Sequence, residues 1–128
     1  MKEEKQTDSE IIDSSVWLSY LLEGNYQNII DREKTFFISP LSIFEIKKKL
    51  LDKEIPTHEI EEKIKFIKRK SISINLNDSI AERASEISHE NQIPAIDSLI
   101  YASALLNNCI VLTKDNDFRN LKNTKILE

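Results

Sequence analysis

The sequence predicts an α/β fold, a three-layer sandwich in which helices cover both faces of a mainly parallel sheet of four to five strands. Short apolar runs typical of strands alternate along the chain with longer segments of helical periodicity. Strands that are separated by helices pair in parallel, and a parallel sheet is covered on both faces. The 128 residues are 40% hydrophobic and 31% charged, which suits one compact domain with one core and a solvated surface.

In the first half of the chain, apolar spacing and turn residues define the expected elements. Ile11-Ile12 forms a short strand. Residues 14–23 form a helix, because Val16 and Tyr20 recur at helical spacing and Gly24 is placed to end it. The other elements expected here are a shorter helix at about 26–32, a strand at 35–38, a helix over 39–52 with Pro40 in its first turn, and a helix over 57–69 that follows Pro56.

The second half continues the same alternation. A strand is expected over 71–75, and Asn77 is placed to cap a helix over 78–90. Pro94 opens the next helix, which reaches residue 107. The remaining elements are an entirely apolar strand over 109–112, a turn or short helix over 116–121, and a short edge strand over 125–127.

The composition excludes several classes of site. A single glycine, Gly24, cannot supply the glycines of a dinucleotide-binding fingerprint or a phosphate-binding P-loop. A single cysteine, Cys109, rules out a disulfide framework and a thiolate zinc site. His58 and His89 are too few for a three-histidine metal centre. Carboxylates are abundant, with 22 Asp and Glu against 18 Lys and Arg, so metal chemistry here would use oxygen ligands and favour Mg²⁺ or Mn²⁺.

The sequence shows no targeting or membrane segment. The first ten residues are charged and lack the apolar run of a signal peptide. The stretch 91–113 carries few charges, but it contains Pro94, an aspartate and several Ser and Asn, so it does not resemble a membrane span. We expect a cytoplasmic protein with a charged lead over residues 1–9 and a single domain over 10–128.

Two expected strands deliver aspartate to the same edge of the sheet. In open parallel sheets, ligands bind beyond the carboxyl ends of the strands. Asp13 follows the first strand, with Ser14 and Ser15 after it, and Asp115 and Asp117 follow the fourth, close behind Thr113. Each of these aspartates also has an ordinary explanation, since Asp13 suits a helix N-cap and the other two suit a turn.

The sequence around Asp97 indicates a functional role more strongly than the sequence around Glu45 does. Asp97 is the only charged residue between 91 and 113, on a helix whose apolar residues cover most of its circumference. A carboxylate there needs compensation, although an acid in a first helical turn is also favoured by the helix dipole. Glu45 has Lys48 and Lys49 one turn later, and a surface ion pair explains it fully.

Four segments together resemble the PIN domain family, and within it the VapC-type ribonuclease toxins of toxin–antitoxin operons. The segments are 11–15 (IIDSS), 41–45 (LSIFE), 93–104 (IPAIDSLIYASA) and 111–118 (VLTKDNDF), and the likeness spans nearly the whole chain. By position, Asp13, Glu45, Asp97 and Asp115 match the family's acidic quartet. Asp117 matches a further acid that is often present, and Ser15 and Thr113 match small polar residues that orient the acids.

The resemblance implies a PIN-like nuclease that hydrolyses RNA phosphodiester bonds with Mg²⁺ or Mn²⁺ and leaves a 5′-phosphate and a 3′-hydroxyl. Asp13, Asp97, Asp115 and Asp117 would be metal ligands, and Glu45 a ligand or a water-positioning acid. The resemblance further implies an antitoxin partner and a homodimer. Two other interpretations stay open: a catalytically inactive module that binds RNA or protein, and a housekeeping RNA-processing nuclease.

An acidic centre repels RNA, so basic residues are needed elsewhere. Residues 47–70 hold nine Lys and Arg against five Asp and Glu, a net charge of +4. The run Lys68-Arg69-Lys70 is the best local candidate for a phosphate-binding rim beside the acids. A solvated helical face explains the same lysines.

Overall fold

The computed structural model describes residues 9–128 and places five strands in one sheet. The strands are β1 (Glu10–Ile12), β2 (Phe36–Ile38), β3 (Ser71–Ser73), β4 (Ile110–Thr113) and β5 (Thr124–Ile126). Their order is β3-β2-β1-β4-β5, and every neighbouring pair is parallel. The expected α/β class and the parallel sheet are confirmed, and the C-terminal edge strand is present.

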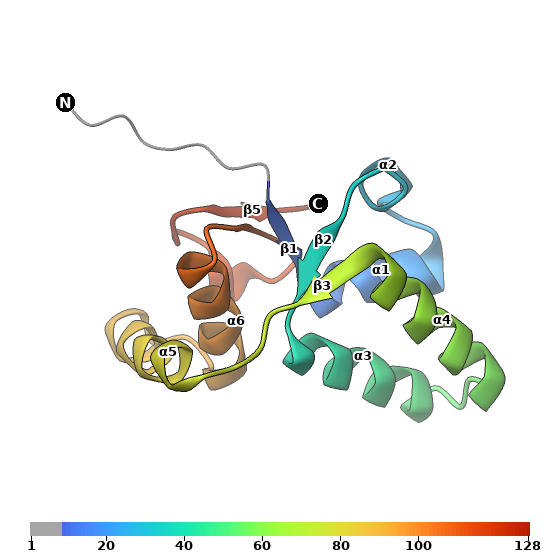
Figure 1. Cartoon of the computed structure of the whole chain (residues 1–128), viewed down its shortest axis with the longest axis horizontal. Helices are drawn as coiled ribbons and strands as arrows, with labels where there is room; N and C mark the ends of the chain where they lie inside the picture. Colours follow the sequence, from blue (N-terminus) through green and yellow to red (C-terminus); the bar gives the residue numbers. More distant parts are fainter. Residues whose placement is uncertain (1–8) are drawn as a thin grey trace.

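Helices cover both faces of this sheet (Figure 1). They are α1 (Ser14–Glu23), α2 (Gln27–Ile30), α3 (Pro40–Asp52), α4 (Thr57–Lys70), α5 (Asp78–Asn91) and α6 (Ala95–Leu106), together with the 3₁₀ helix η1 (Asn116–Phe118). In Figure 1, α5 and α6 lie on one side of the strands, and α1, α3 and α4 lie on the other. Within residues 9–128, no helix combines the length and the apolar character needed to cross a membrane.

Alternation along the strands divides the interior into two cores. Ile11 packs with Val111 and residues of α5 and α6, whereas its neighbour Ile12 packs with Leu112 and residues of α1 to α4. Successive side chains of a strand point to opposite faces, and both faces of this sheet are covered. This is why consecutive residues of β1 and β4, Ile11-Ile12 and Val111-Leu112, are apolar rather than alternating with polar residues.

The helix ends follow the signals expected from the sequence. Gly24 ends α1 in the left-handed region with φ 73°, a backbone conformation that favours glycine. Asn77 accepts a hydrogen bond from the backbone N–H of Ile80 at 2.9 Å and caps α5. Pro40 occupies the start of α3, where Ser39 accepts from the N–H of Leu41 at 3.1 Å.

Some bounds differ from the expected ones. β3 ends at Ser73 rather than residue 75, although Ile74 still donates its N–H to Ile38 O at 2.9 Å. α2 is a single turn that begins at Gln27 rather than residue 26, because Tyr26 has a φ of 63° and lies outside the right-handed helical region. Apart from Ser9, the charged lead expected over residues 1–9 lies outside the described residues.

Candidate metal centre

The strand order brings the predicted acids to one edge of the sheet. The chain runs outward from β1 through β2 to β3 and later returns to place β4 on the other side of β1. The β1–β4 boundary is therefore a topological switch point, where a crevice opens at the carboxyl ends of the strands. Asp13 leaves β1 and Asp115 follows β4 at this boundary. Asp97 lies in the first turn of α6, and Glu45 lies in α3, which follows β2.

Three carboxylates come together in a cluster. One oxygen atom from each of Asp97, Asp115 and Asp117 lies within 4.8 Å of those of the other two. Asp97 and Asp115 are half-buried and Asp117 is exposed. The turn is ordered by its own acid, because Asp115 Oδ1 accepts the backbone N–H of Asp117 at 2.9 Å. Three carboxylate oxygens at this spacing could bind the same cation.

Asp13 is buried and is held by two hydroxyl groups. Ser15 Oγ and Thr113 Oγ1 each donate to Asp13 Oδ2 at 2.8 Å. Each hydroxyl also accepts a backbone N–H, that of Lys114 at 3.0 Å for Ser15 and that of Asp115 at 2.9 Å for Thr113. Asp13 occupies the N-cap position of α1, but its side chain makes no capping hydrogen bond. The ordinary N-cap explanation therefore does not describe this carboxylate.

Glu45 is held at the same end of the sheet by a hydrogen bond from Ser14, the first residue of α1. Ser14 Oγ donates to Glu45 Oε1 at 3.0 Å, and both side chains are at least partly buried. The surface ion pair that the sequence allows with Lys48 is absent, since Lys48 pairs with Asp52 at 2.9 Å. Sequence reasoning gave Ser14 no role. The signal that could have identified Ser14 is its position directly after Asp13. Adjacent residues at a helix start point in different directions, so Ser14 and Ser15 can contact different acids.

Three of the acids, Asp13, Glu45 and Asp97, have raised pKa values, with burial as the largest cause and neighbouring acids contributing. Burial, followed by the charges of Asp115 and Asp13, raises the pKa of Asp97 to about 7. Burial also raises the pKa of Asp13, although its hydrogen bonds from Thr113 and Ser15 act in the opposite direction. The pKa of Glu45 is raised by burial and, against the Ser14 hydrogen bond, by the charges of Asp13 and Asp115. All of these carboxylates therefore share one electrostatic environment.

The residues present fit a hard divalent cation. The donor set is made of carboxylate oxygens, the ligands preferred by Mg²⁺ and Mn²⁺. Within residues 9–128, none of the five acids forms an ion pair with a Lys or Arg. The acids thus gather with hydroxyl donors but without a basic partner among residues 9–128, and a bound cation would relieve their repulsion. Asp97, Asp115 and Asp117 have the tightest ligand geometry, with Asp13 beside them.

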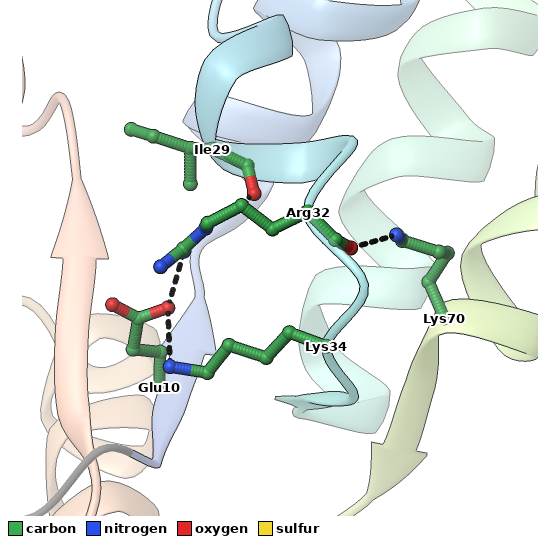
Figure 2. A network of polar contacts seen from close by, with 5 residues as sticks. All are labelled: Glu10, Ile29, Arg32, Lys34 and Lys70. Atoms are coloured by element: carbon green, nitrogen blue, oxygen red, sulfur yellow. Dashed lines mark hydrogen bonds and ion pairs between the residues drawn. The ribbon is translucent and has the colours of Figure 1, made fainter.

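The run Lys68-Arg69-Lys70 lies at the amino ends of the strands, whereas the acids lie at the carboxyl ends. The expected position beside the acids is therefore wrong. These residues end α4 and lead directly into the first residue of β3. Lys70 donates to the backbone oxygen of Arg32 at 2.8 Å, and Arg32 pairs with Glu10 at the start of β1 (Figure 2). A helix that precedes a parallel strand ends at the amino edge, whereas the acids follow the carboxyl edge. Whether this run contacts RNA stays a prediction.

The acids do not coincide with the large apolar groove of the domain. That groove of about 440 Å³ lies between α5 and α6 and is lined by residues that include Ala84, His89 and Leu99. None of the five acids lines it. The candidate site is therefore defined by charge and strand topology rather than by a hydrophobic cavity.

The fold and the acidic edge together define an α/β protein with a carboxylate cluster at the carboxyl ends of parallel strands. A PIN domain model matches residues 11–123, and the chain therefore belongs to the PIN domain family. This confirms the resemblance drawn from the sequence. No curated protein matches the chain in sequence.

Solved structures share the fold over most of the chain. A toxin–antitoxin complex from Klebsiella pneumoniae aligns with a TM-score of 0.75 and 21% identity, covering 91% of this chain and 96% of that one. VapBC2 from Rickettsia felis, bound to a DNA fragment from its promoter, has a TM-score of 0.73, 17% identity and coverages of 93% and 96%. The Sarcin-Ricin loop cleaving toxin VapC20 of Mycobacterium tuberculosis has a TM-score of 0.63, 15% identity and coverages of 86% and 92%. These TM-scores establish a shared fold, and at such low identities the likeness extends to the fold alone.

Proposed function

We propose that the protein is a Mg²⁺- or Mn²⁺-dependent endoribonuclease that hydrolyses RNA phosphodiester bonds. The observation that carries the proposal is the convergence of acids from four elements at one edge of the sheet, three of them within 4.8 Å of one another. Membership of the PIN family, together with the fold shared with an RNA-cleaving toxin, supports this chemistry.

In the proposal, four of the acids bind the cation. Asp97, Asp115 and Asp117 would hold the cation, and Asp13 would complete its ligand sphere. The hydroxyls of Ser15 and Thr113 would keep Asp13 in one orientation by donating to a single oxygen. A bound divalent cation would supply Lewis acidity toward a phosphoryl oxygen and a water activated at neutral pH.

Glu45 would act on the attacking water. Its oxygens are not part of the cluster of three, and its pKa is raised by burial and by the neighbouring acids. A carboxylate with a raised pKa is better suited to accept a proton near neutral pH. The Ser14 hydrogen bond occupies Oε1, and Oε2 would be the proton-accepting atom.

We further propose that the protein is the toxin of a type II toxin–antitoxin module, with an antitoxin as its partner. Support comes from three structural neighbours that are toxin–antitoxin assemblies. Co-expression with the product of an adjacent small gene should give a stable complex in which RNA cleavage is suppressed. A housekeeping nuclease would be active without such a partner gene. Homodimerisation stays a prediction for size-exclusion chromatography.

The decisive experiment is incubation of the purified protein with RNA and Mg²⁺. We expect cleavage products with 5′-phosphate and 3′-hydroxyl ends, their loss on chelation, and a loss of activity of at least about 100-fold in Asp97→Asn. Asp52→Asn is the matched control, because Asp52 lies exposed on α3 and, among residues 9–128, forms an ion pair with Lys48 alone. Equal cleavage by wild type and Asp97→Asn would overturn the proposal. RNA binding that is indifferent to chelation, without any cleavage, would favour an inactive binding module.

A further inference from the structure

The acidic edge needs a cation that can hold RNA without neutralising the acids. Within residues 9–128 the five acids have no basic partner, and the run 68–70 lies at the other edge. We propose that Lys114 binds a phosphate of the RNA strand next to the cleavage site. This inference rests on the proposed function, because it deepens the recognition of the same substrate.

Lys114 is placed by the same residues that build the site. It stands between Thr113, which holds Asp13, and Asp115 of the carboxylate cluster. Its backbone N–H donates to Ser15 Oγ at 3.0 Å, and Ser15 in turn donates to Asp13. The backbone of Lys114 is therefore fixed relative to the acids, within the segment that leaves β4 at the carboxyl edge.

The side chain of Lys114 extends along the flank of α1, away from the carboxylates. Its Nζ lies 3.4 Å from Ser19 Oγ and 5.7 Å from the centroid of the Tyr26 ring. Ser15 and Ser19 are separated by four residues of α1, roughly 6 Å along the helix axis. The ammonium group is thus displaced from the acids by about one helical turn, and it lies between Ser19 of α1 and Tyr26, the residue before α2.

The groups in direct contact with Lys114 are neutral. Ser19 Oγ in turn donates to Glu23 Oε1 at 3.1 Å, so the nearest acid on α1 is reached through a hydroxyl and does not pair with Lys114 directly. A hydroxyl and an aromatic face restrict the ammonium group without cancelling it. Tyr26 is itself held, because its hydroxyl donates to the backbone oxygen of Glu128 at 3.0 Å. Lys48 and Arg83, in contrast, each pair with a carboxylate on their own helix. Within the described part of the chain, no carboxylate lies at ion-pair distance from Lys114.

A single lysine so placed would recognise the RNA backbone rather than its bases. An ammonium group acts on phosphate as a point charge and fixes the position of the strand without reading its sequence. The contact would draw the strand across the acidic edge and leave sequence preference to other residues. Its energetic signature is the release of counterions, which makes binding depend on salt.

The test compares Lys114→Gln with Lys122→Gln. Binding of a fluorescent single-stranded RNA is measured in chelator, where no cleavage occurs, at several salt concentrations. For Lys114→Gln we expect affinity to fall roughly three- to ten-fold, and the slope of log K against log salt to decrease in magnitude by about 0.7. Lys114→Arg should restore the slope, and Lys122→Gln, at an exposed lysine just before the start of β5, should match wild type.

The outcomes separate this inference from the proposed function. An unchanged slope in Lys114→Gln, or an equal loss in Lys122→Gln, overturns the role of Lys114 even if the wild-type protein cleaves RNA. A wild-type protein that binds RNA with the expected slope but never cleaves it would contradict the nuclease proposal and leave the Lys114 contact supported. Thermal melts of the variants confirm that each is folded, as expected for substitutions at exposed side chains.

Discussion

At the scale of single residues, Asp97 combines partial burial with the charges of its neighbours. Its pKa of about 7 in the folded protein lies well above the ordinary value of 3.8, with burial as the largest cause and Asp115 next. The folded state therefore binds a proton at Asp97 more tightly than the unfolded chain does. The stabilising contribution is complete below pH 4 and is lost as the pH rises to about 7.

Asp97→Asn should remove this pH dependence from the metal-free protein. At pH 8 we expect the variant to melt roughly 3 to 6 °C higher than wild type, which corresponds to about 1 kcal/mol in a domain of this size. The whole pKa shift of Asp97 would correspond to a larger gain in stability. Asp97 is half-buried, however, so solvent screens part of its repulsion by the neighbouring acids. Melting curves in chelator at pH 4 to 8 test this expectation. Parallel curves for the two proteins across that range would contradict it.

At the scale of elements, the Ser14 hydrogen bond connects α1 to α3 at the candidate site. Ser14 begins α1, and Glu45 lies within α3, so a bond of 3.0 Å fixes the position of one helix relative to the other. The two adjacent serines divide their bonds, since Ser14 holds Glu45 whereas Ser15 holds Asp13. This pair of residues thus orients acids that come from two different elements.

Ser14→Ala should slow RNA cleavage roughly ten-fold, in the range seen when a partner that orients an active-site group is lost. Ser14→Thr should retain activity, because it keeps the hydroxyl. In an enzyme that already carries Glu45→Gln, Ser14→Ala should add no further loss, since the two residues act as one unit. Ser79→Ala, at an exposed position of α5, serves as the control. Equal slowing by Ser14→Ala in both backgrounds would indicate a general structural effect instead.

Local signals explain which elements were predictable. Gly24, Pro40 and Asn77 act through the backbone next to them, and the structure places helix ends at all three. The role of Glu45 was less accessible, because its spacing to Lys48 fits a surface ion pair equally well. Only the packing of α3 against α1 distinguishes the two, and that contact joins residues 31 positions apart.

At the scale of the whole molecule, strand order decides which charged groups can act together. Asp13 and Asp115 are far apart in sequence, yet they meet because β1 and β4 are neighbours. The basic run at 68–70 is dense in charge, but its position before β3 puts it at the amino edge. Charge counts along a chain do not contain this information. The alternation of helices and strands shows which end of a strand a residue follows, and the strand order of the folded sheet shows which of those residues meet.

Binding of a cation at the acidic edge should stabilise the entire domain. A ligand that binds only the folded state raises the unfolding free energy by about 2.7 kcal/mol at a concentration 100 times its dissociation constant. We expect the melting temperature of wild type to rise with Mg²⁺, and that of Asp97→Asn to rise much less, because the variant lacks one of three clustered carboxylates. Asp52→Asn should respond as wild type does, since it changes the net charge equally at a site remote from the cluster. An identical response of Asp97→Asn and wild type to Mg²⁺ would mean that the stabilising cation binds elsewhere, and the acids at the β1–β4 boundary would then have no shared ligand.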